Sequence, residues 1–255
     1  MASEIIWEGD TEYGHYQVVD TLYDSRPARV LYSGERRTAQ SGVAKDANPD
    51  LLFDYNQRML ELAVNLSAGR VLLIGGAVET LPMALLKVLP EVRIDVVEPD
   101  TGLTDLAYEF FDLPVDDRLR IIHTDGRSFL KSTHERYDII FVDAFVHSVI
   151  PRDLRTVEAF QEYAAHLRPK GVLAMNVISA YHGRGSHILH DICAAAMWSY
   201  ANLELFLAGR DYSFWLPQNF IFTAQQTNSR SLAAYVRYEA VKIPKVQSTD
   251  APHDS

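Results

Sequence analysis

The segment that decides the fold is RVLLIGGAVETLPMALLKVLP, at residues 70–90. It opens with a short apolar run, rich in β-forming residues, which is typical of a strand covered on both faces of a parallel sheet. Gly75-Gly76 follows, and a helical pattern then begins, with Thr80 as its N-cap and Pro82 in its first turn. A strand, a glycine-containing loop and a helix in this order predict the cofactor loop of a nucleotide-binding α/β protein.

The chain beyond this segment continues to alternate between strands and helices. A glycine-rich turn precedes the last helix, which Ser186 can cap, and an antiparallel pair of strands at the sheet edge follows it. This alternation predicts an α/β protein with a mostly parallel, seven-stranded sheet, right-handed crossovers and helices on both faces. Beyond residue 90, strands are expected at 93–100, 119–126, 137–145, 171–179, 201–209 and 219–226, and helices at 101–113, 127–134 and 156–167.

The first 50 residues have a different pattern. Alternating pieces at 15–23 and 28–34 are separated by turn signals, which predicts β-hairpins, and residues 39–50 are expected to form a loop. Residues 51–66 carry apolar side chains at helical spacing. The final residues are polar and aperiodic, which predicts disorder. The expected domains are an N-terminal β-hairpin region at 1–50, a Rossmann-like cofactor-binding domain at 51–240 and a disordered tail at 241–255.

Composition narrows the class of protein. The 255 residues are 47% hydrophobic, enough for a full core, and 24 Lys+Arg against 34 Asp+Glu give a formal net charge of −10. This acidic balance disfavours nucleic acid or an anionic membrane as a partner, because phosphate binding needs clustered Lys and Arg. The sequence has neither the pattern of a signal peptide nor that of a membrane span, so a soluble, cytoplasmic protein is expected.

Cysteine and histidine do not indicate a metal site. The single cysteine, Cys193, excludes an intramolecular disulfide and lies in an apolar stretch, which favours a buried structural thiol. His182, His187 and His190 are close in sequence, but no further ligand stands at a matching spacing. No metal is therefore predicted.

Acidic residues follow several of the predicted strands. Ligands of an open parallel sheet bind beyond the carboxyl ends of its strands, which points to the Gly75–Thr80 loop, Glu98 with Asp100, Asp125-Gly126 and Asp143. Glu98 can accept hydrogen bonds from both ribose hydroxyls, or it is a solvated strand-end acid. Asp125 can accept from an adenine amine, or it forms a turn without a ligand. Asp143 can hold a cationic amine and accept its proton, or it caps a helix.

These residues resemble, in order, the spermidine synthase family, the polyamine aminopropyltransferases. The family is a Rossmann-like relative of the class I S-adenosylmethionine-dependent methyltransferases, so the resemblance implies the methyltransferase fold. The similarity runs from about residue 13 to about residue 225. Its segments are EYGHYQVVD, LYSGERRTAQS, FDYNQRML, RVLLIGG, DVVEPD, TDGRSFL, YDIIFVDAF and IPRDLRTVEAF.

The resemblance implies a reaction and a set of site residues. The family transfers an aminopropyl group from decarboxylated S-adenosylmethionine to putrescine or a similar amine, and its members commonly form homodimers. Carried over residue by residue, Glu98 would bind the ribose, Asp125 the adenine end, and Asp143 would deprotonate the attacking amine. Tyr55 would line the amine pocket and Gln40 would touch the cofactor. The remaining expected cofactor contacts are Gly75, Gly76, Glu79, Asp100 and Gly126.

The loop departs from the family's Gly-Gly-Gly-Asp-Gly-Gly pattern. Ala77, Val78 and Glu79 follow the first two glycines, and Val78 stands where the family has the aspartate that grips the aminopropyl ammonium. Glu79 is the candidate to replace that charge. Two further family acids are replaced by Val146 and Gln57. Each lost charged hydrogen bond costs roughly 1.5–3 kcal/mol, which weakens binding of a diamine such as putrescine.

Three functions stay open from the sequence. The first is aminopropyl transfer to an amine other than or beyond putrescine, with Asp143 as the base. The second is methyl transfer from intact S-adenosylmethionine, against which the negative charge of Glu79 counts, because that cofactor carries a carboxylate. The third is a non-catalytic relative that binds a partner or a nucleoside.

Overall fold

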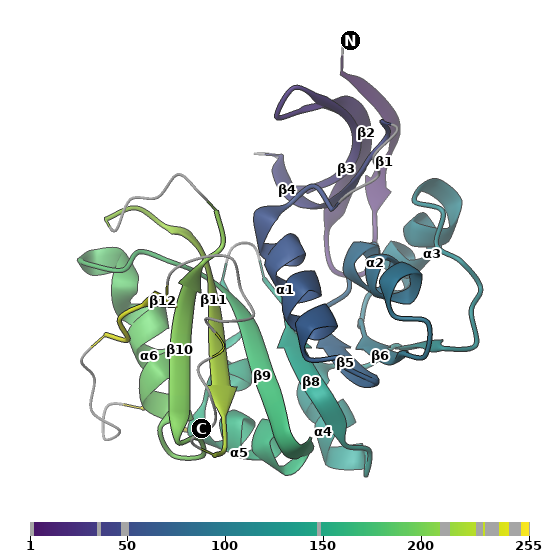
Figure 1. Ribbon diagram of the computed structural model, residues 1–255. Coiled ribbons are helices and arrows are strands. Elements are labelled where there is room, and N and C mark those ends of the chain that lie inside the picture. Colours follow the sequence, from purple (N-terminus) through teal and green to yellow (C-terminus); the bar gives the residue numbers. More distant parts are fainter. Residues whose placement is uncertain are drawn as a thin grey trace.

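Two β-sheets form the framework of the protein. The computed structural model describes residues 3–34, 37–46, 51–146, 149–209, 215–227, 232, 240–244 and 251–254. A four-stranded antiparallel sheet lies at the N-terminal end, above a larger sheet that is flanked by helices (Figure 1). This arrangement confirms the predicted α/β fold with a preceding β-hairpin region.

The N-terminal sheet is a meander of β1 (Glu4–Asp10), β2 (His15–Tyr23), β3 (Arg26–Ser33) and β4 (Thr38–Ala44). The prediction of a loop at 39–50 is therefore wrong for its first half. Small residues with low β propensity obscured β4, but they are needed because the strand packs closely. A Cβ at Gly42 would lie 2.9 Å from the Leu52 side chain, and Ser41 Oγ lies 3.0 Å from Thr80 Oγ1.

The larger sheet has the strand order β12-β10-β11-β9-β8-β5-β6-β7. The five strands from β9 to β7 are parallel, and β10 with β11 forms the predicted antiparallel pair. The seven predicted strands are present, and the two-residue β12 adds an eighth at the edge. Their bounds are β5 (Arg70–Ile74), β6 (Arg93–Val97), β7 (Leu119–Ile122), β8 (Tyr137–Val142), β9 (Leu167–Ser179), β10 (Asn202–Leu207), β11 (Gln218–Gln225) and β12 (Ala240–Val241).

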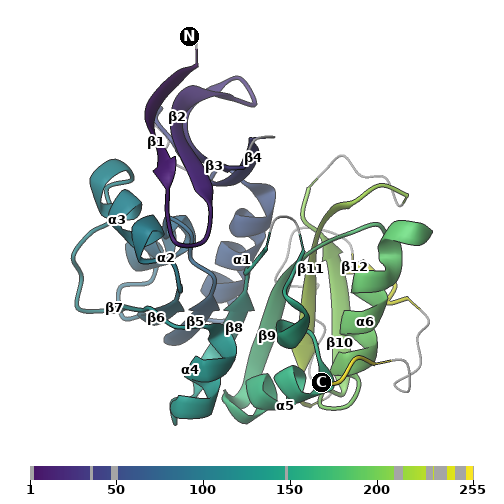
Figure 2. The same ribbon diagram turned by 180° about the vertical axis from the view of Figure 1, so that it is seen from behind.

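Helices cover both faces of this sheet (Figure 2). They are α1 (Asp54–Asn65), α2 (Thr80–Val88), α3 (Thr101–Phe110), α4 (Gly126–Ser132), α5 (Val157–Ala165) and α6 (His187–Ala196), with short 3₁₀ helices η1 (Arg152–Leu154) and η2 (Arg184–Ser186). Successive strand residues point to opposite faces. Leu72 and Ile74 of β5 therefore pack in the core with α4, α5 and α6, whereas Val71 and Leu73 pack with α1 and α2. None of the described helices is long and apolar enough to cross a membrane.

Two predicted helix caps differ from the structure. The N-cap of α2 is Glu79, one residue before the predicted Thr80, whose hydroxyl instead lies against Ser41. Ser186 is the N-cap of α6 by position, but its hydroxyl donates to the Gly183 carbonyl at 2.8 Å. Sequence shows that a hydroxyl is available, but tertiary neighbours decide where it bonds.

Part of the predicted tail contacts the rest of the protein. Val241 belongs to β12, and residues 251–254 lie against α5, where the Pro252 carbonyl accepts from the Val157 amide at 2.8 Å. The prediction of a disordered tail at 241–255 did not include these contacts. The polar side chains of these residues meet complementary groups on the helices, which composition alone does not reveal. Residues 245–250 and 255 lie outside the described part of the chain.

Candidate active site

A cavity of about 230 Å³ lies at the carboxyl ends of β5 and β8. The strand order reverses there, because the chain runs from β5 out to β7 and returns on the other side of β5 as β8. Gly75, with φ of 87°, follows β5 and packs against Asp143 at the end of β8. A Cβ on this residue would lie 2.6 Å from the Asp143 carbonyl oxygen, so the position requires glycine.

The structure brings nearly all of the predicted site residues to this cavity. Glu79 is the exception among them. The predicted residues that line the cavity are Gln40, Tyr55, Gly75, Gly76, Glu98, Asp100, Asp125, Gly126 and Asp143.

The altered loop keeps a glycine-like backbone. Ala77 and Glu79 have φ values of 49° and 59°, in the left-handed region that glycine adopts freely. Both occupy positions where the family pattern has glycine. A residue with a Cβ costs about 1–2 kcal/mol in this conformation, so the loop is strained in order to keep its path.

The side chains of Val78 and Glu79 point away from the cavity. Val78 is fully buried in the core that joins α3 to the N-terminal sheet. Glu79 is also fully buried, and its carboxyl group folds back over Gly76, where a Cβ would collide with it. No described residue donates a hydrogen bond to either carboxyl oxygen of Glu79. The pKa of Glu79 is raised well above its ordinary value, mainly by burial and also by the nearby Glu98. Glu79 therefore adds no charge to the cavity.

Glu98 braces the same loop from below. Its Oε2 accepts from the amides of Gly76 and Ala77, each at 3.0 Å, and its Oε1 accepts from the Asp100 amide at 3.0 Å. Burial raises the Glu98 pKa, and these backbone hydrogen bonds oppose the rise. Three of about four acceptor positions are filled, so the carboxylate orders the loop as well as facing the cavity.

Asp100 and Asp125 both cap helices. Asp100 accepts from the Gly102 amide at 3.0 Å and from the Thr11 hydroxyl at 2.5 Å, which ties α3 to the β1–β2 turn. Asp125 accepts from the Ser128 amide at 2.8 Å at the start of α4. Burial raises the Asp125 pKa, but this bond and neighbouring amides outweigh it and leave the pKa below its ordinary value. Both residues combine the capping role with a place on the cavity wall.

Asp143 has the environment of a base that works near neutral pH. Its Oδ1 accepts from Asn176 Nδ2 at 2.8 Å, and the hydroxyl of Tyr55 lies beside the carboxyl group. Burial raises the Asp143 pKa to about 7, although both neighbours act to lower it. A carboxyl group with a pKa near the working pH can accept a proton from a substrate and release it again.

A second cavity of about 350 Å³ adjoins the first. Gln40, Tyr55 and Phe145 line both, and Asn176, the partner of Asp143, lines the second. Its wall also carries Tyr23, Phe53 and two exposed carboxylates, Asp24 and Asp54. The pKa of Tyr23 is raised, first by burial and then by the nearby Asp24, Tyr32 and Asp54. The carboxylates of Asp24 and Asp54 therefore both lie near the Tyr23 phenol.

The first cavity is acidic. Glu98, Asp100, Asp125, Asp143 and Asp153 line it, and none of the described lining residues is Lys, Arg or His. Such a wall favours a cationic ligand. Within the described residues, no three His, Cys, Asp or Glu side chains are grouped as a metal site requires.

Sequence reasoning missed several residues of the site. Tyr13 and Tyr16 reach the first cavity from the β1–β2 turn and from β2, and Asn176 lies in the buried, otherwise apolar part of β9 at 172–177. An asparagine inside GVLAMNVIS is the signal that could have identified Asn176, because a polar group buried in a strand needs a partner. Tyr13 and Tyr16 gave no comparable signal.

Comparison with known proteins relates this site to one family. Residues 53–185 match the spermine/spermidine synthase domain. A "Probable polyamine aminopropyl transferase" of Bifidobacterium longum is 31% identical over 184 residues, covering 72% of this chain and 40% of that protein. "Putrescine N-methyltransferase 2" of Nicotiana tabacum is 30% identical over 149 residues, covering 56% of this chain and 42% of that protein. The chain spans about two fifths of the length of these relatives.

A solved structure is similar to this protein in its fold. The crystal structure of a probable spermidine synthase from Corynebacterium glutamicum superposes with a TM-score of 0.78 at 22% identity, covering 99% of this chain and 97% of that one. The domain match extends over half of the chain, and it includes the loop, Glu98, Asp125 and Asp143. The chain belongs to the spermine/spermidine synthase family, the polyamine aminopropyltransferases.

Proposed function

We propose that this protein transfers an aminopropyl group from decarboxylated S-adenosylmethionine to an amine other than or beyond putrescine. The observation that carries the proposal is the position of Asp143. Its carboxyl group lines the first cavity, and its hydrogen-bond partner Asn176 lines the second. A base placed between a cofactor cavity and an acceptor cavity can take the proton of an amine in the acceptor cavity as that amine attacks the cofactor.

The reaction is a direct displacement. The acceptor nitrogen attacks the aminopropyl methylene carbon that is bound to the sulfonium sulfur, so a C–N bond forms and the bond between that carbon and sulfur breaks. The bonding electron pair passes to sulfur, which leaves as the neutral thioether methylthioadenosine. Asp143 takes the proton that the amine loses. In this proposal Glu98 contacts the ribose, Asp125 the adenine end, and Gln40 with the Gly75-Gly76 backbone the rest of the cofactor.

The charge of the first cavity supports the decarboxylated cofactor. That molecule is cationic at both its sulfonium and its amine, whereas intact S-adenosylmethionine also carries a carboxylate. The wall of described residues offers carboxylates and no basic side chain. A cofactor carboxylate would therefore face like charges, which disfavours its binding.

The second cavity supports an altered acceptor. The family acids replaced by Val146 and Gln57 are lost, but Asp24 and Asp54 lie around the Tyr23 hydroxyl at another place on the wall. Tyr55 stacks on Phe53 at a centroid distance of 5.8 Å and forms an aromatic side of this cavity. Aromatic faces and carboxylates together attract an alkyl ammonium. We expect an amine whose distal cation reaches Asp24 and Asp54.

A methyltransferase is the second candidate. Two observations favour it: the similarity to "Putrescine N-methyltransferase 2", and the burial of Glu79, which removes a negative charge that would repel intact S-adenosylmethionine. The lack of a basic side chain on the described cavity wall places it second.

Calorimetric titration distinguishes these functions. Decarboxylated S-adenosylmethionine and methylthioadenosine should bind more tightly than S-adenosylmethionine. A preference for the intact cofactor would support methyl transfer, and binding of none of the three would support a non-catalytic relative.

The role of Asp143 is tested by substitution. With a panel of di- and polyamines, Asp143→Asn should lower the transfer rate about 100- to 10,000-fold, the usual range for a general base. The product is measured by mass spectrometry, and Asp105→Asn on the exposed face of α3 is the matched control. An unchanged rate in Asp143→Asn would contradict the proposed mechanism.

A further inference from the structure

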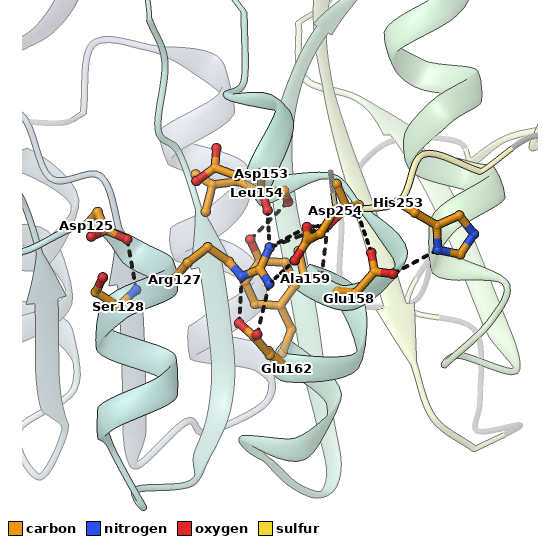
Figure 3. A network of polar contacts seen from close by, with 12 residues as sticks. Asp125, Arg127, Ser128, Asp153, Leu154, Glu158, Ala159, Glu162, His253 and Asp254 are labelled. Carbon is orange, nitrogen blue, oxygen red and sulfur yellow. Dashed lines mark hydrogen bonds and ion pairs between the residues drawn. The ribbon is translucent and has the colours of Figure 1, made fainter.

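Residues 251–254 dock beside the first cavity. The Asp254 carboxylate accepts from the Thr156 hydroxyl at 2.7 Å, and its amide donates to Glu158 at 2.9 Å (Figure 3). His253 contacts the same glutamate at 2.8 Å. The segment therefore covers the N-terminus of α5 through both backbone and side-chain hydrogen bonds.

Arg127 is the centre of this network. Its guanidinium is buried, with a 7% exposed side chain, and it makes paired contacts with Glu162 at 2.6 and 2.9 Å and with Asp254 at 2.8 and 3.1 Å. It also donates to the Asp153 carbonyl at 2.6 Å. The five N–H donors of a guanidinium are thus all used. Figure 3 shows the side chain reaching from α4 to the group formed by Glu162, Asp153 and Asp254.

Arg127 connects two segments of the cavity wall. It follows Asp125 and Gly126, which line the cavity at the start of α4. Its acceptor Asp153 belongs to η1, where Asp153 and Leu154 also line the cavity. A Cβ at Gly126 would lie 3.3 Å from the Leu154 side chain, so the two segments touch.

The wall between segment 251–254 and the first cavity is thin. A third cavity, of about 500 Å³, is lined by Arg127, His253 and Asp254, and it shares Asp125 and Asp153 with the first. Asp125 and Asp153 therefore lie on the boundary between the cavity lined by the docked segment and the cavity where we expect the nucleoside. Arg127 contacts both Asp254 and Asp153, so it links the docked segment to the cavity wall.

We propose that Asp254 is a positioning residue for cofactor binding: it completes the Arg127 clamp that fixes η1 against Asp125 and Gly126 at the nucleoside end of the cavity. Without the Asp254 carboxylate, two N–H donors of Arg127 lose their acceptor. The hydroxyl of Thr156, the N-cap of α5, also loses the acceptor of its hydrogen bond. The clamp then holds η1 less firmly, and the nucleoside meets a less ordered wall. The identity of the ligand rests on the proposed function, but the clamp itself does not.

Asp254→Asn tests this role, because it keeps the shape of the side chain and removes its charge. Hydrogen–deuterium exchange of the unliganded protein should show faster exchange at amides 152–156. The Kd for methylthioadenosine should rise roughly two- to thirtyfold, the range of coupling through a shared network. In a transfer assay the KM for the cofactor should rise while kcat stays the same. Arg127→Lys keeps the positive charge but not the paired N–H donors of the guanidinium. It should change the exchange rate, the Kd and the KM in the same direction.

The matched control is Asp116→Asn, which breaks another Asp–Arg pair, with Arg118 at 2.6 Å, away from this cavity. It should alter neither the exchange of 152–156 nor the Kd. Unchanged exchange in Asp254→Asn would overturn the clamp, and faster exchange with an unchanged Kd would overturn its link to the cofactor. If the unaltered protein binds no nucleoside, the proposed function fails and with it the link, while the exchange measurement still decides the clamp.

Discussion

Glu79 is a carboxylic acid held inside the protein without a hydrogen-bond donor among the described residues. Burial of an unpaired charge is expensive, so such a group stays protonated in the folded state. The left-handed φ of 59° turns it under the loop, next to Glu98. A residue that the sequence suggested as a ligand contact is instead part of the packing beneath the loop.

The protonation of Glu79 predicts how stability depends on pH. Its folded pKa is raised well above 4.5, so at higher pH the unfolded chain loses this proton while the folded protein keeps it. The unfolded state then binds fewer protons, and the free energy of unfolding falls as the pH rises from 4.5 toward the raised pKa. Glu79→Gln removes this term, so its stability relative to the unaltered protein should be higher at pH 8 than at pH 5.

Urea unfolding at the two pH values measures this difference. Glu91→Gln, the same substitution at an exposed position before β6, is the control. A difference between Glu79→Gln and the unaltered protein that is the same at both pH values would contradict the buried, protonated state of Glu79.

At the scale of elements, β9 and β11 support the carboxyl group of Asp143, which we propose as the base. Asn219 of β11 donates to Asn176 Oδ1 at 2.9 Å, which turns the Asn176 amide so that its Nδ2 faces Asp143. The antiparallel register sets Asn219 opposite Ile178 and Ile221 opposite Asn176, so the two asparagines are close neighbours across the strands. The Asp143 carboxyl group is therefore oriented by a hydrogen-bonded pair of asparagines from two strands.

Removal of this support should shift the pH dependence of transfer. The Asn176 hydrogen bond lowers the Asp143 pKa, so Asn176→Ala should raise it above its present value of about 7. Because the proposed base, Asp143, must be deprotonated to act, the acidic limb of the kcat/KM profile should move to higher pH by about one pH unit, the equivalent of one charged hydrogen bond. Asn202→Ala on β10, whose amide bonds Gln225, is the control. A lower rate without a moved limb would show that Asn176 acts on packing and not on the base.

The elements differ in how well the sequence predicted them. The apolar run of β5 and the alternation after it required a parallel sheet, because each residue of the run is covered on one face or the other. β4 was missed because its pairing partner and its contact with α2 outweigh the low β propensity of its residues. The direction of Glu79 and the docking of residues 251–254 were missed for a related reason. Both depend on backbone geometry and on partners far away in the sequence.

At the scale of the whole molecule, the second cavity exists only because the two sheets meet. Tyr23 ends β2 of the N-terminal sheet and Asp24 lies in the turn that follows it, whereas Asp54 comes from the start of α1 and Asn219 from the larger sheet. The acceptor specificity that we propose is therefore divided between parts of the chain that pack together only in the complete fold. This arrangement allows the acceptor to change while the proposed base, Asp143, stays in place.

The proposed role of Asp24 and Asp54 in binding the amine substrate can be tested independently of Asp143. Asp24→Asn and Asp54→Asn should each raise the KM for a diamine or longer polyamine about three- to tenfold. This is less than a buried charged hydrogen bond would give, because both side chains are exposed. The KM for the cofactor should not change. A monoamine acceptor has no distal cation to lose, so its KM should be the same in both variants and in the unaltered protein, which makes it the internal control. If monoamine and diamine suffer equally, the two aspartates shape the cavity without binding the distal cation, and the acceptor must be recognised elsewhere.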